Sequence, residues 1–357
     1  MQRIILLFSV LLLTNKLIAQ EEFDVLVWSD ECDGSGMIDT SKWYHQTQLP
    51  NGNSWYNGEI QHYTNRTENT YLEDGAMYIA AKKETFTDQG VTKEYTSARL
   101  NSKFAFTYGK VEVRAKLPFG VGTWPAIWML GRNIDEPGGY WQPNFGNVGW
   151  PACGEIDIME HWGTNQNYVS SALHTPSSFG GTVNVGGTTL NDVSNTYHVY
   201  ALEWTAEKMD FSVDGTVHYT YNPAVKDAST WPFDAKQYLL LNVAILPSIA
   251  ANFTESRMVI DYVRVYQSSP TGLLENNPEE DVRLYPNPSK QNPTLRVPAE
   301  YLGGSLIVHT LDGRVIKSER LNNVQQRVDT SSLSPGVYIV EVRSPGGMGR
   351  AVRMLVE

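Results

Sequence analysis

The segment EIDIME carries three carboxylates, Glu155, Asp157 and Glu160, separated only by apolar residues. A solvated acidic surface would be less apolar, and a buried strand does not normally hold three acids. Carboxyl groups that face one another can serve as nucleophile and as general acid and base on a glycosidic bond. A calcium site or a surface acidic cluster is the alternative interpretation of the same residues.

The spacing of the acids fits a strand with an irregularity. Glu155 and Asp157 follow the period of two that places side chains on one face, whereas Glu160 comes one residue late. A β-bulge at Ile158–Met159 would return Glu160 to that face. The backbones of Glu155 and Glu160 would then lie roughly 13 Å apart. Their side chains, leaning together, would approach the ~5 Å separation of a retaining glycosidase.

Such an arrangement gives each acid its own task. Glu155 would attack the anomeric carbon as nucleophile. Glu160, its pKa raised by negative neighbours, would protonate the leaving oxygen and later activate water. Asp157 would hold Glu155 by a hydrogen bond and help to set which group carries the proton.

Four tryptophans surround the acidic segment. Trp124 and Trp128 share one face of the strand-like stretch GTWPAIWML, Trp150 precedes the acids and Trp162 follows them. Flat aromatic faces stack on sugar rings, with polar groups around them. Core packing explains most single tryptophans, but four around three carboxylates indicate a substrate cleft.

The elements that position these groups belong to a large exported chain. It has 357 residues, 41% hydrophobic and 19% charged, which suggests two domains. Residues 1–20 read as a secretory signal peptide, whose apolar run is too short to span a bilayer, and no later segment could span one. The formal charge of −11 argues against nucleic acid and anionic membranes as partners, and makes a polyanionic substrate less favourable than a neutral one.

The composition changes after residue 267. All ten tryptophans precede this point, and residues 268–357 carry ten basic and ten acidic side chains, so the net charge belongs to the first part. The polar segment 268–281 reads as a linker. We therefore expect a catalytic domain over residues 21–267 and a small C-terminal domain over residues 282–357.

Both parts are predicted to be all-β. Short alternating segments broken by turns dominate, and Asp214–Gly215 and Asp312–Gly313 mark tight hairpins. The first part should form one large β-sandwich and the second a small one. Cys32 and Cys153 each lie in a strand-like apolar stretch, so two separate buried thiols are favoured over a disulfide.

Together these features resemble glycoside hydrolase family 16, in its laminarinase branch of β-glucanases. The resemblance covers about residues 22–267, and its motifs follow the family's order: WSDECDGSG, NGEIQHYT, SARLNSKFAFTYGKVEVRAKLP, GTWPAIWMLG, WPACGEIDIMEHWG, SALHTP, YALEWTAEKMDFSVDG and MVIDYVRVYQ. It implies a curved, concanavalin A-like β-jelly-roll with a concave cleft, retaining hydrolysis, and endo-cleavage of β-1,3- or mixed β-1,3/1,4-glucans. It implies no cofactor for catalysis.

The resemblance assigns the same roles to the acidic segment. Glu155 matches the nucleophile, Asp157 the assisting acid and Glu160 the acid/base. The inserted Met159 is the laminarinase form of the motif, which dedicated bacterial lichenases lack.

It also implies residues that bind substrate. Trp124 and Trp128 match cleft aromatics, and His174 in SALHTP matches a polar residue beside the catalytic strand. Arg99 and Asn57 lie in motifs that usually line the glycone side, with structural hydrogen bonding as the alternative. The chain departs from the family at LNVAILPSIAANF, which removes one possible aromatic from the outer subsites, and at Cys32, where Phe is usual.

Many family members bind one structural Ca²⁺ on the convex face. The matching positions here are Glu31, the backbone of Gly75, and Asp261. Carboxylate and carbonyl oxygens suit this hard cation. An ordinary solvated strand residue is the alternative for Asp261.

The tail resembles the C-terminal sorting domain of the type IX secretion system, through LYPNPS, LDGRVI and LSPGVYIVEV. Such domains are read by the export machinery and are removed or anchored at the cell surface. A carbohydrate-binding module is the alternative, but the tail has no Trp or Phe, only Tyr285, Tyr301 and Tyr338.

The residues and the resemblance favour a secreted endo-β-1,3-glucanase acting as a monomer on laminarin-like glucan. A relative that cuts agar, porphyran or carrageenan is one alternative, although no basic run lies near the acidic segment. A non-catalytic glucan-binding protein is another. Proteins of that kind lose the catalytic carboxylates, and here all three are present.

Overall fold

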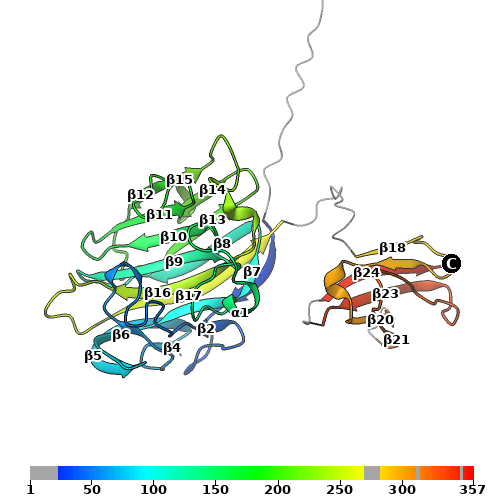
Figure 1. Ribbon diagram of the computed structural model, residues 1–357, viewed down its shortest axis with the longest axis horizontal. Helices are drawn as coiled ribbons and strands as arrows, with labels where there is room; N and C mark the ends of the chain where they lie inside the picture. Colours follow the sequence, from blue (N-terminus) through cyan, green and yellow to red (C-terminus); the bar gives the residue numbers. More distant parts are fainter. Residues whose placement is uncertain (1–22, 269–281, 311–313, 346–348) are drawn as a thin grey trace, which may run out of the picture. The chain divides into compact units, whose positions relative to one another are not determined.

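The computed structural model describes residues 23–268, 282–310, 314–345 and 349–357 (Figure 1). The chain divides into two compact units, residues 1–269 and 270–357, and this division falls within the predicted linker. The predicted signal peptide, the linker beyond Ser268 and the turn at Asp312–Gly313 lie outside the described residues. Within the described ranges, no helix has the length and apolar character needed to cross a membrane.

Two β-sheets face each other in the first unit. The ten-stranded sheet has the order β15 (Thr216–Tyr221), β14 (Met209–Val213), β13 (His198–Trp204), β8 (Gly109–Lys116), β17 (Glu255–Gln267), β5 (Ala76–Asp88), β6 (Val91–Ser97) and β3 (His62–Tyr63), with β1 (Val25–Asp30) on β17 and β4 (Thr70–Glu73) on β5. The seven-stranded sheet has the order β12 (Val185–Thr189), β11 (Tyr168–His174), β10 (Glu155–His161), β9 (Thr123–Gly131), β16 (Gln237–Ile245), β7 (Arg99–Phe106) and β2 (Trp43–His45).

Among the described residues of this unit, helical structure is confined to three short turns, which are η1 (Tyr56–Gly58), α1 (Gln142–Phe145) and η2 (Pro232–Asp234). The predicted all-β sandwich is confirmed. The hairpin at Asp214–Gly215 is also confirmed, because it joins β14 to β15 with φ of 49° and 77° at the two turn residues. Two positive φ values are what a two-residue turn between twisted strands requires.

The main core lies between the two sheets. Apolar side chains at every second position of a strand point into this core. On β8, for example, Val111, Val113 and Ala115 are fully buried and the residues between them are only partly buried. A second apolar cluster lies on the other face of the seven-stranded sheet, where Leu130, Ile134, Cys153, Tyr238 and Leu240 pack together. One end of that outer face is therefore covered, and the remainder is left for a cleft.

Both cysteines are buried free thiols, as predicted. Cys32 belongs to the main core and Cys153 to the second cluster, so they lie on opposite faces of the seven-stranded sheet. Burial raises the pKa of the Cys153 thiol to about 12, with a smaller contribution from Glu155. Cys153 is therefore an unreactive packing residue, although it lies two positions before the acidic segment.

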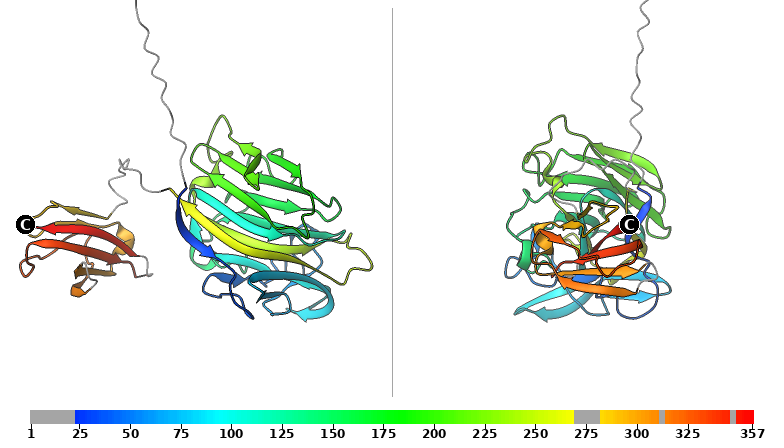
Figure 2. Two further views of the ribbon diagram at one scale, coloured as in Figure 1. Left: turned by 180° about the vertical axis from the view of Figure 1, so that it is seen from behind. Right: turned by 90° about the vertical axis from the view of Figure 1, so that its right-hand side faces the viewer.

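The second unit has its own two small sheets, seen as the orange to red strands of Figure 2. One contains β18 (Arg283–Tyr285), β19 (Thr294–Arg296) and β22 (Gln325–Arg327), and the other has the order β21 (Val315–Arg320), β20 (Ser305–Thr310), β23 (Gly336–Arg343) and β24 (Gly349–Val356), with η3 at Ala299–Tyr301. Leu295 from the first sheet and Leu306, Val340 and Met354 from the second are fully buried in one cluster. The described residues thus form a small β-sandwich.

Candidate active site

Strand β10 carries the three acids and contains the predicted bulge. Its register against β11 shifts between Asp157 and Glu160, where two residues of β10 face a single residue of its neighbour. Its register against β9 shifts between Asp157 and Met159. Ile158 and Met159 both turn into the main core. The extra residue thereby returns Glu160 to the face that carries Glu155 and Asp157, as the spacing predicted.

The three acids border a cleft of about 330 Å³ on the outer face of the seven-stranded sheet. Strands β9 and β16 form its floor, and the segments around residues 56–63 and 134–150 contribute its walls. Among the residues predicted to bind substrate, five border this cleft: Asn57, Arg99, Trp124, Trp128 and Trp150. The other two, Trp162 and His174, are not among the residues that border it, but each contacts one that does.

Two tryptophans hold the outer carboxylates through hydrogen bonds. The indole N–H of Trp150 donates to Glu155 Oε2 over 2.9 Å, and that of Trp124 donates to Glu160 Oε1 over 3.0 Å. A donor fixed in this way restricts the rotation of the carboxylate that accepts its proton. These tryptophans therefore orient the acids in addition to bordering the cleft.

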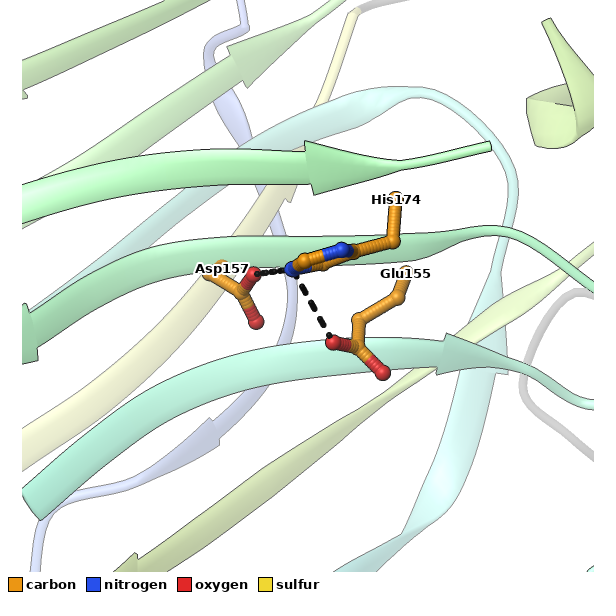
Figure 3. A group of neighbouring side chains, drawn as sticks. All are labelled: Glu155, Asp157 and His174. Atoms are coloured by element: carbon orange, nitrogen blue, oxygen red, sulfur yellow. Dashed lines mark ion pairs between the residues drawn. The ribbon is translucent and has the colours of Figure 1, made fainter. Parts of the chain in front are cut away.

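His174, on the neighbouring strand β11, faces Asp157 and Glu155 (Figure 3). Its Nε2 lies 3.2 Å from Asp157 Oδ2 and 3.5 Å from Glu155 Oε1. The backbone N–H of Gly180 donates to Nδ1 over 3.1 Å, so Nδ1 is unprotonated and Nε2 carries the proton. His174 Nε2 thus carries its proton beside Asp157 and Glu155, but neither contact has hydrogen-bond geometry, and Asp157 Oδ2 has no hydrogen-bond partner among the described residues.

The same three groups could in principle hold a metal ion, because one ligand atom from each of Glu155, Asp157 and His174 lies within 4.8 Å of the others. In the arrangement described, His174 Nε2 carries a proton, and a ring nitrogen that carries a proton does not bind a metal ion. The alternative interpretation of the acids as a surface cluster does not fit, because Asp157 is only 4% exposed.

The pKa values of all three acids are raised, and burial is the first cause in each case. Repulsion from Asp157 raises the pKa of Glu155 further, and repulsion from Glu160 raises that of Asp157. For Glu160, the hydrogen bond from Trp124 opposes the effect of burial. The predicted rise at Glu160 is therefore present, but its leading cause is burial and not its negative neighbours.

Asp157→Asn is expected to stabilise the protein at pH 8. At a pH between the unfolded and folded pKa values of Asp157, this carboxyl is ionised in the unfolded chain. Folding must then either bind a proton to it or bury its charge, and both cost free energy. The stability contribution of a carboxyl with a raised pKa is fully present below its unfolded pKa and is lost as the pH rises through the folded pKa. The free energy of unfolding of Asp157→Asn should therefore exceed that of wild type by about 1–2 kcal/mol at pH 8. This difference corresponds to a Tm that is higher by roughly 2–6 °C.

The measurement is thermal unfolding of both proteins between pH 4 and pH 8. The difference in Tm should shrink towards pH 4, because the folded protein keeps Asp157 protonated there and a growing fraction of the unfolded chain is protonated as well. An equal or lower Tm for Asp157→Asn at pH 8 would mean that the carboxyl is not held against an electrostatic cost.

Trp128 is fixed in the floor of the cleft by contacts on its edge and its face. Its indole N–H donates to Asn242 Oδ1 over 2.7 Å, and the Arg99 guanidinium lies 4.8 Å from its ring centroid. Arg99 is 3% exposed and is paired with both oxygens of Glu136 at 2.8 Å. Arg99 thus borders the cleft and also forms a buried structural ion pair, so both interpretations of this residue describe part of its environment.

Trp162 stacks on Trp124 and does not border the cleft. Their ring centroids are 4.2 Å apart and their planes 20° apart. Because Trp124 donates to Glu160, this stack supports a residue that holds an acid. Asn57 does border the cleft, as an exposed residue with a φ of 55°.

Glu59 and Tyr63 border the cleft and were missed from the sequence. The Tyr63 hydroxyl and the Gln61 amide donate to Glu59 Oε2 over 2.8 and 2.7 Å, and Asn242 donates to Tyr63 over 3.1 Å. Burial raises the pKa of Glu59, against the effect of these hydrogen bonds. The alternation Glu59, Gln61, Tyr63 in NGEIQHYT was the signal that could have revealed a polar face.

The predicted calcium ligands belong to neighbouring segments, because Ile260 beside Asp261 pairs with Met77, close to Gly75. The two predicted carboxylates are each paired with arginine. Arg264 donates to Glu31 Oε2 over 2.6 Å, and Arg114 donates to Asp261 Oδ2 over 2.5 Å. An ion would have to compete with a guanidinium for each carboxylate, and calcium binding stays a prediction.

Comparisons with known proteins match both units. The family model described as glycosyl hydrolases family 16 matches residues 56–264, and that of the secretion system C-terminal sorting domain matches residues 283–354. A β-glucanase from Rhodothermus marinus is 38% identical over 258 residues. The match covers 68% of this chain and 85% of the β-glucanase. A keratan-sulfate endo-1,4-β-galactosidase from Sphingobacterium multivorum is 32% identical, over 78% of this chain and 62% of its own.

Solved structures resemble the first unit as well. A LamA variant from Z. galactanivorans, in complex with laminaritriose and laminaritetraose, is 47% identical. The match covers 69% of this chain and 100% of that one, with a TM-score of 0.65.

Proposed function

We propose, from the premise that this chain belongs to family 16 of the glycosyl hydrolases, that it is an exported endo-β-1,3-glucanase that cleaves laminarin-like glucans with net retention. Mixed β-1,3/1,4-glucans are a further substrate class within this proposal. The observation that carries it is the bulge in β10, which brings Glu155 and Glu160 to one face of a cleft. A donor from a different tryptophan holds each of these acids.

The site suits a double displacement. Glu155, ionised and oriented by Trp150, attacks the anomeric carbon and forms a glycosyl ester, while Glu160 gives its proton to the departing glycosidic oxygen. Glu160, now ionised, takes a proton from water, which attacks the anomeric carbon and releases Glu155. Burial raises the pKa of both acids, so it favours the protonated Glu160 that the first step requires and opposes the ionised Glu155, whose charge the Trp150 hydrogen bond and His174 stabilise.

Asp157 and His174 support the nucleophile in this mechanism. When Glu155 is spent as an ester, its negative charge disappears and the repulsion that it exerts on Asp157 is relieved. His174 Nε2 lies 3.5 Å from Glu155 and 3.2 Å from Asp157, so it stays beside the charge of Asp157 when Glu155 is an ester. Neither group needs to exchange a proton with the sugar.

The charge of the cleft favours a neutral glucan over a sulfated galactan. Among the described residues that line the cleft, the only basic one is Arg99, which is already paired with Glu136. Six acids line the same cleft: Glu59, Asp135, Glu136, Glu155, Asp157 and Glu160. A sulfate brought into this surface would meet repulsion in a partly buried setting. The non-catalytic alternative is disfavoured because the complete set of three acids is present.

The test is a product profile on laminarin, lichenan, curdlan, agarose and carrageenan. We expect laminarin to be cut internally, with oligosaccharides of several lengths early in the reaction, and no products from agarose or carrageenan. Products from a galactan in place of laminarin would support the alternative enzyme. Binding of laminarin without any product would support the glucan-binding protein.

For the tail, we propose recognition by the type IX secretion machinery, since the sorting-domain model matches residues 283–354. The second unit is a compact sandwich with its own core, which suits a domain read independently of the enzyme. Deleting residues 282–357 should leave the enzyme inside the producing cell, as measured by laminarinase activity in cell and medium fractions. Export of the truncated chain at the wild-type level would contradict this role.

We also propose that calcium stabilises the first unit at Glu31, Gly75 and Asp261. Saturating calcium should raise the Tm of the metal-free protein, because a ligand at 100 times its Kd adds about 2.7 kcal/mol to the free energy of unfolding. Asp261→Asn should abolish the increase, whereas Asp210→Asn, which removes a carboxylate paired with Lys208 on the same sheet, should retain it. Equal calcium responses in both variants would exclude this site.

A further inference from the structure

The bulge in β10 is contacted from inside the core by a polar side chain. Ser171 is the single residue of β11 that faces the two extra positions of the bulge, because its neighbours on β11 pair with Asp157 and Glu160. Its hydroxyl donates to the backbone oxygen of Ile158, within the bulge, over 2.7 Å. Ser171 is fully buried, so water cannot replace this bond.

A histidine from the opposite sheet completes the contact. His218 on β15 places its Nε2 3.0 Å from Ser171 Oγ. The Ser171 proton is committed to Ile158, so the imidazole must donate its Nε2 proton to Oγ. Burial lowers the pKa of His218, which keeps the ring neutral, and its Nδ1 has no hydrogen-bond partner among the described residues. A polar chain of imidazole, hydroxyl and carbonyl thus links the two sheets at the bulge.

We infer that Ser171 and His218 are positioning residues that fix the bulge and, through it, the place of Glu160 opposite Glu155. Neither residue borders the cleft. A strand that lost its bulge would turn Glu160 towards the core, since a shift of one residue exchanges the two faces. Smaller relaxations would change the distance between the acids, and a displacement of ~1 Å can cost about 100-fold in rate.

This inference rests on the proposed glucan hydrolysis, and it predicts a loss of turnover in Ser171→Ala. The matched control is Ser102→Ala on β7 of the same sheet. Ser102 is also fully buried, donates to Phe104 O over 2.7 Å, accepts from the Leu239 N–H over 2.9 Å, and lies beside another register shift. The two substitutions remove the same group from similar surroundings, but only one of them lies at the acids.

On laminarin, Ser171→Ala should lower kcat about 10- to 100-fold, with KM within about two-fold of wild type. The basic limb of its pH profile should shift, because Glu160 would move relative to Asp157, Trp124 and His174, the groups that face it. Ser102→Ala should lower Tm by a similar amount and keep both kcat and the pH profile. Wild-type kcat and pH profile in Ser171→Ala, or equal losses of kcat in both variants, would overturn the inference.

His218 gives a second route that does not depend on the folding of Ser171→Ala. His218→Gln retains a donor near the position of Nε2 and should keep most of the wild-type kcat, whereas His218→Phe should lose it to the extent of Ser171→Ala. Equal kcat in the Gln and Phe variants would overturn the inference. If wild type cleaves no glucan, the proposed function fails; if it cleaves laminarin and all four variants match it, only the positioning role fails.

Discussion

Glu155→Ser is expected to lower kcat on laminarin by a factor on the order of 10⁴ to 10⁶, as losses of a catalytic nucleophile do. Serine leaves the cleft open but cannot form the glycosyl ester through which the reaction proceeds. The protein should keep its fold and its affinity for laminarin oligosaccharides, because the cleft aromatics are unchanged. Its Tm at neutral pH should not fall, since one buried acid of a mutually repelling group is gone.

Azide provides the decisive part of this experiment. The small anion can enter the space vacated by the carboxylate and attack the anomeric carbon from the same face. Activity should return with azide, and the product from a β-linked substrate should be the α-glycosyl azide. Glu203→Ser on β13 of the opposite sheet is the matched control and should behave like wild type. Near wild-type turnover of Glu155→Ser without azide would show that another group is the nucleophile.

Glu160→Ala is the second substitution with a large expected effect, and its size should depend on the leaving group. On laminarin, whose leaving oxygen needs a proton, kcat should fall by about 10²- to 10⁴-fold, the usual range for general acid–base catalysis. On an aryl β-glucoside oligomer whose phenolate needs no proton, formation of the ester should continue and its hydrolysis should become limiting. Burst release of phenol would display this directly.

The pH profile gives an independent readout of the same residue. Burial raises the pKa of Glu160, so wild type should lose activity as the pH rises and this acid ionises. In Glu160→Ala, the basic limb should disappear for the aryl substrate. Azide should again accelerate turnover, this time yielding a β-glycosyl azide, because it attacks the ester formed by Glu155. A basic limb unchanged in Glu160→Ala would assign it to a different group.

The acidic segment could be interpreted from the sequence because its constraint is local. A strand has a period of two, so an acid one residue late either points into an apolar core or follows a bulge. Burying Glu160 among Ile156 and Ile158 would be costly, which left the bulge as the better prediction. The same local argument identified the hairpin at Asp214–Gly215.

Contacts between segments distant in the chain were not accessible in this way. Arg99 and Glu136 are separated by 37 positions, and His218 and Ser171 by 47. The first pair depends on where the loop that holds Glu136 lies over β7, and the second on how the two sheets pack, and alternation along one strand encodes neither. Trp162 illustrates the same point, because its place beside the acids correctly suggested proximity, but only the fold shows that it stacks on Trp124.

The electrostatics of the site also required the fold. The sequence shows that three acids are close and predicts a raised pKa at Glu160 from repulsion. The degree of burial decides which cause leads, and burial depends on the surrounding walls of the cleft. The tautomer of His174 depends likewise on the N–H of Gly180, six residues further along the chain.

We propose that Glu155 and Glu160 cleave a β-1,3-glucan in two displacements on one face of β10. Proton NMR of the anomeric region during the first minutes of laminarin hydrolysis tests it most directly, before the products mutarotate. Two displacements should produce the β-anomer of the new reducing end first, and the α-anomer should grow in only with mutarotation. Initial appearance of the α-anomer would contradict it, because a single displacement by water would then have inverted the anomeric carbon.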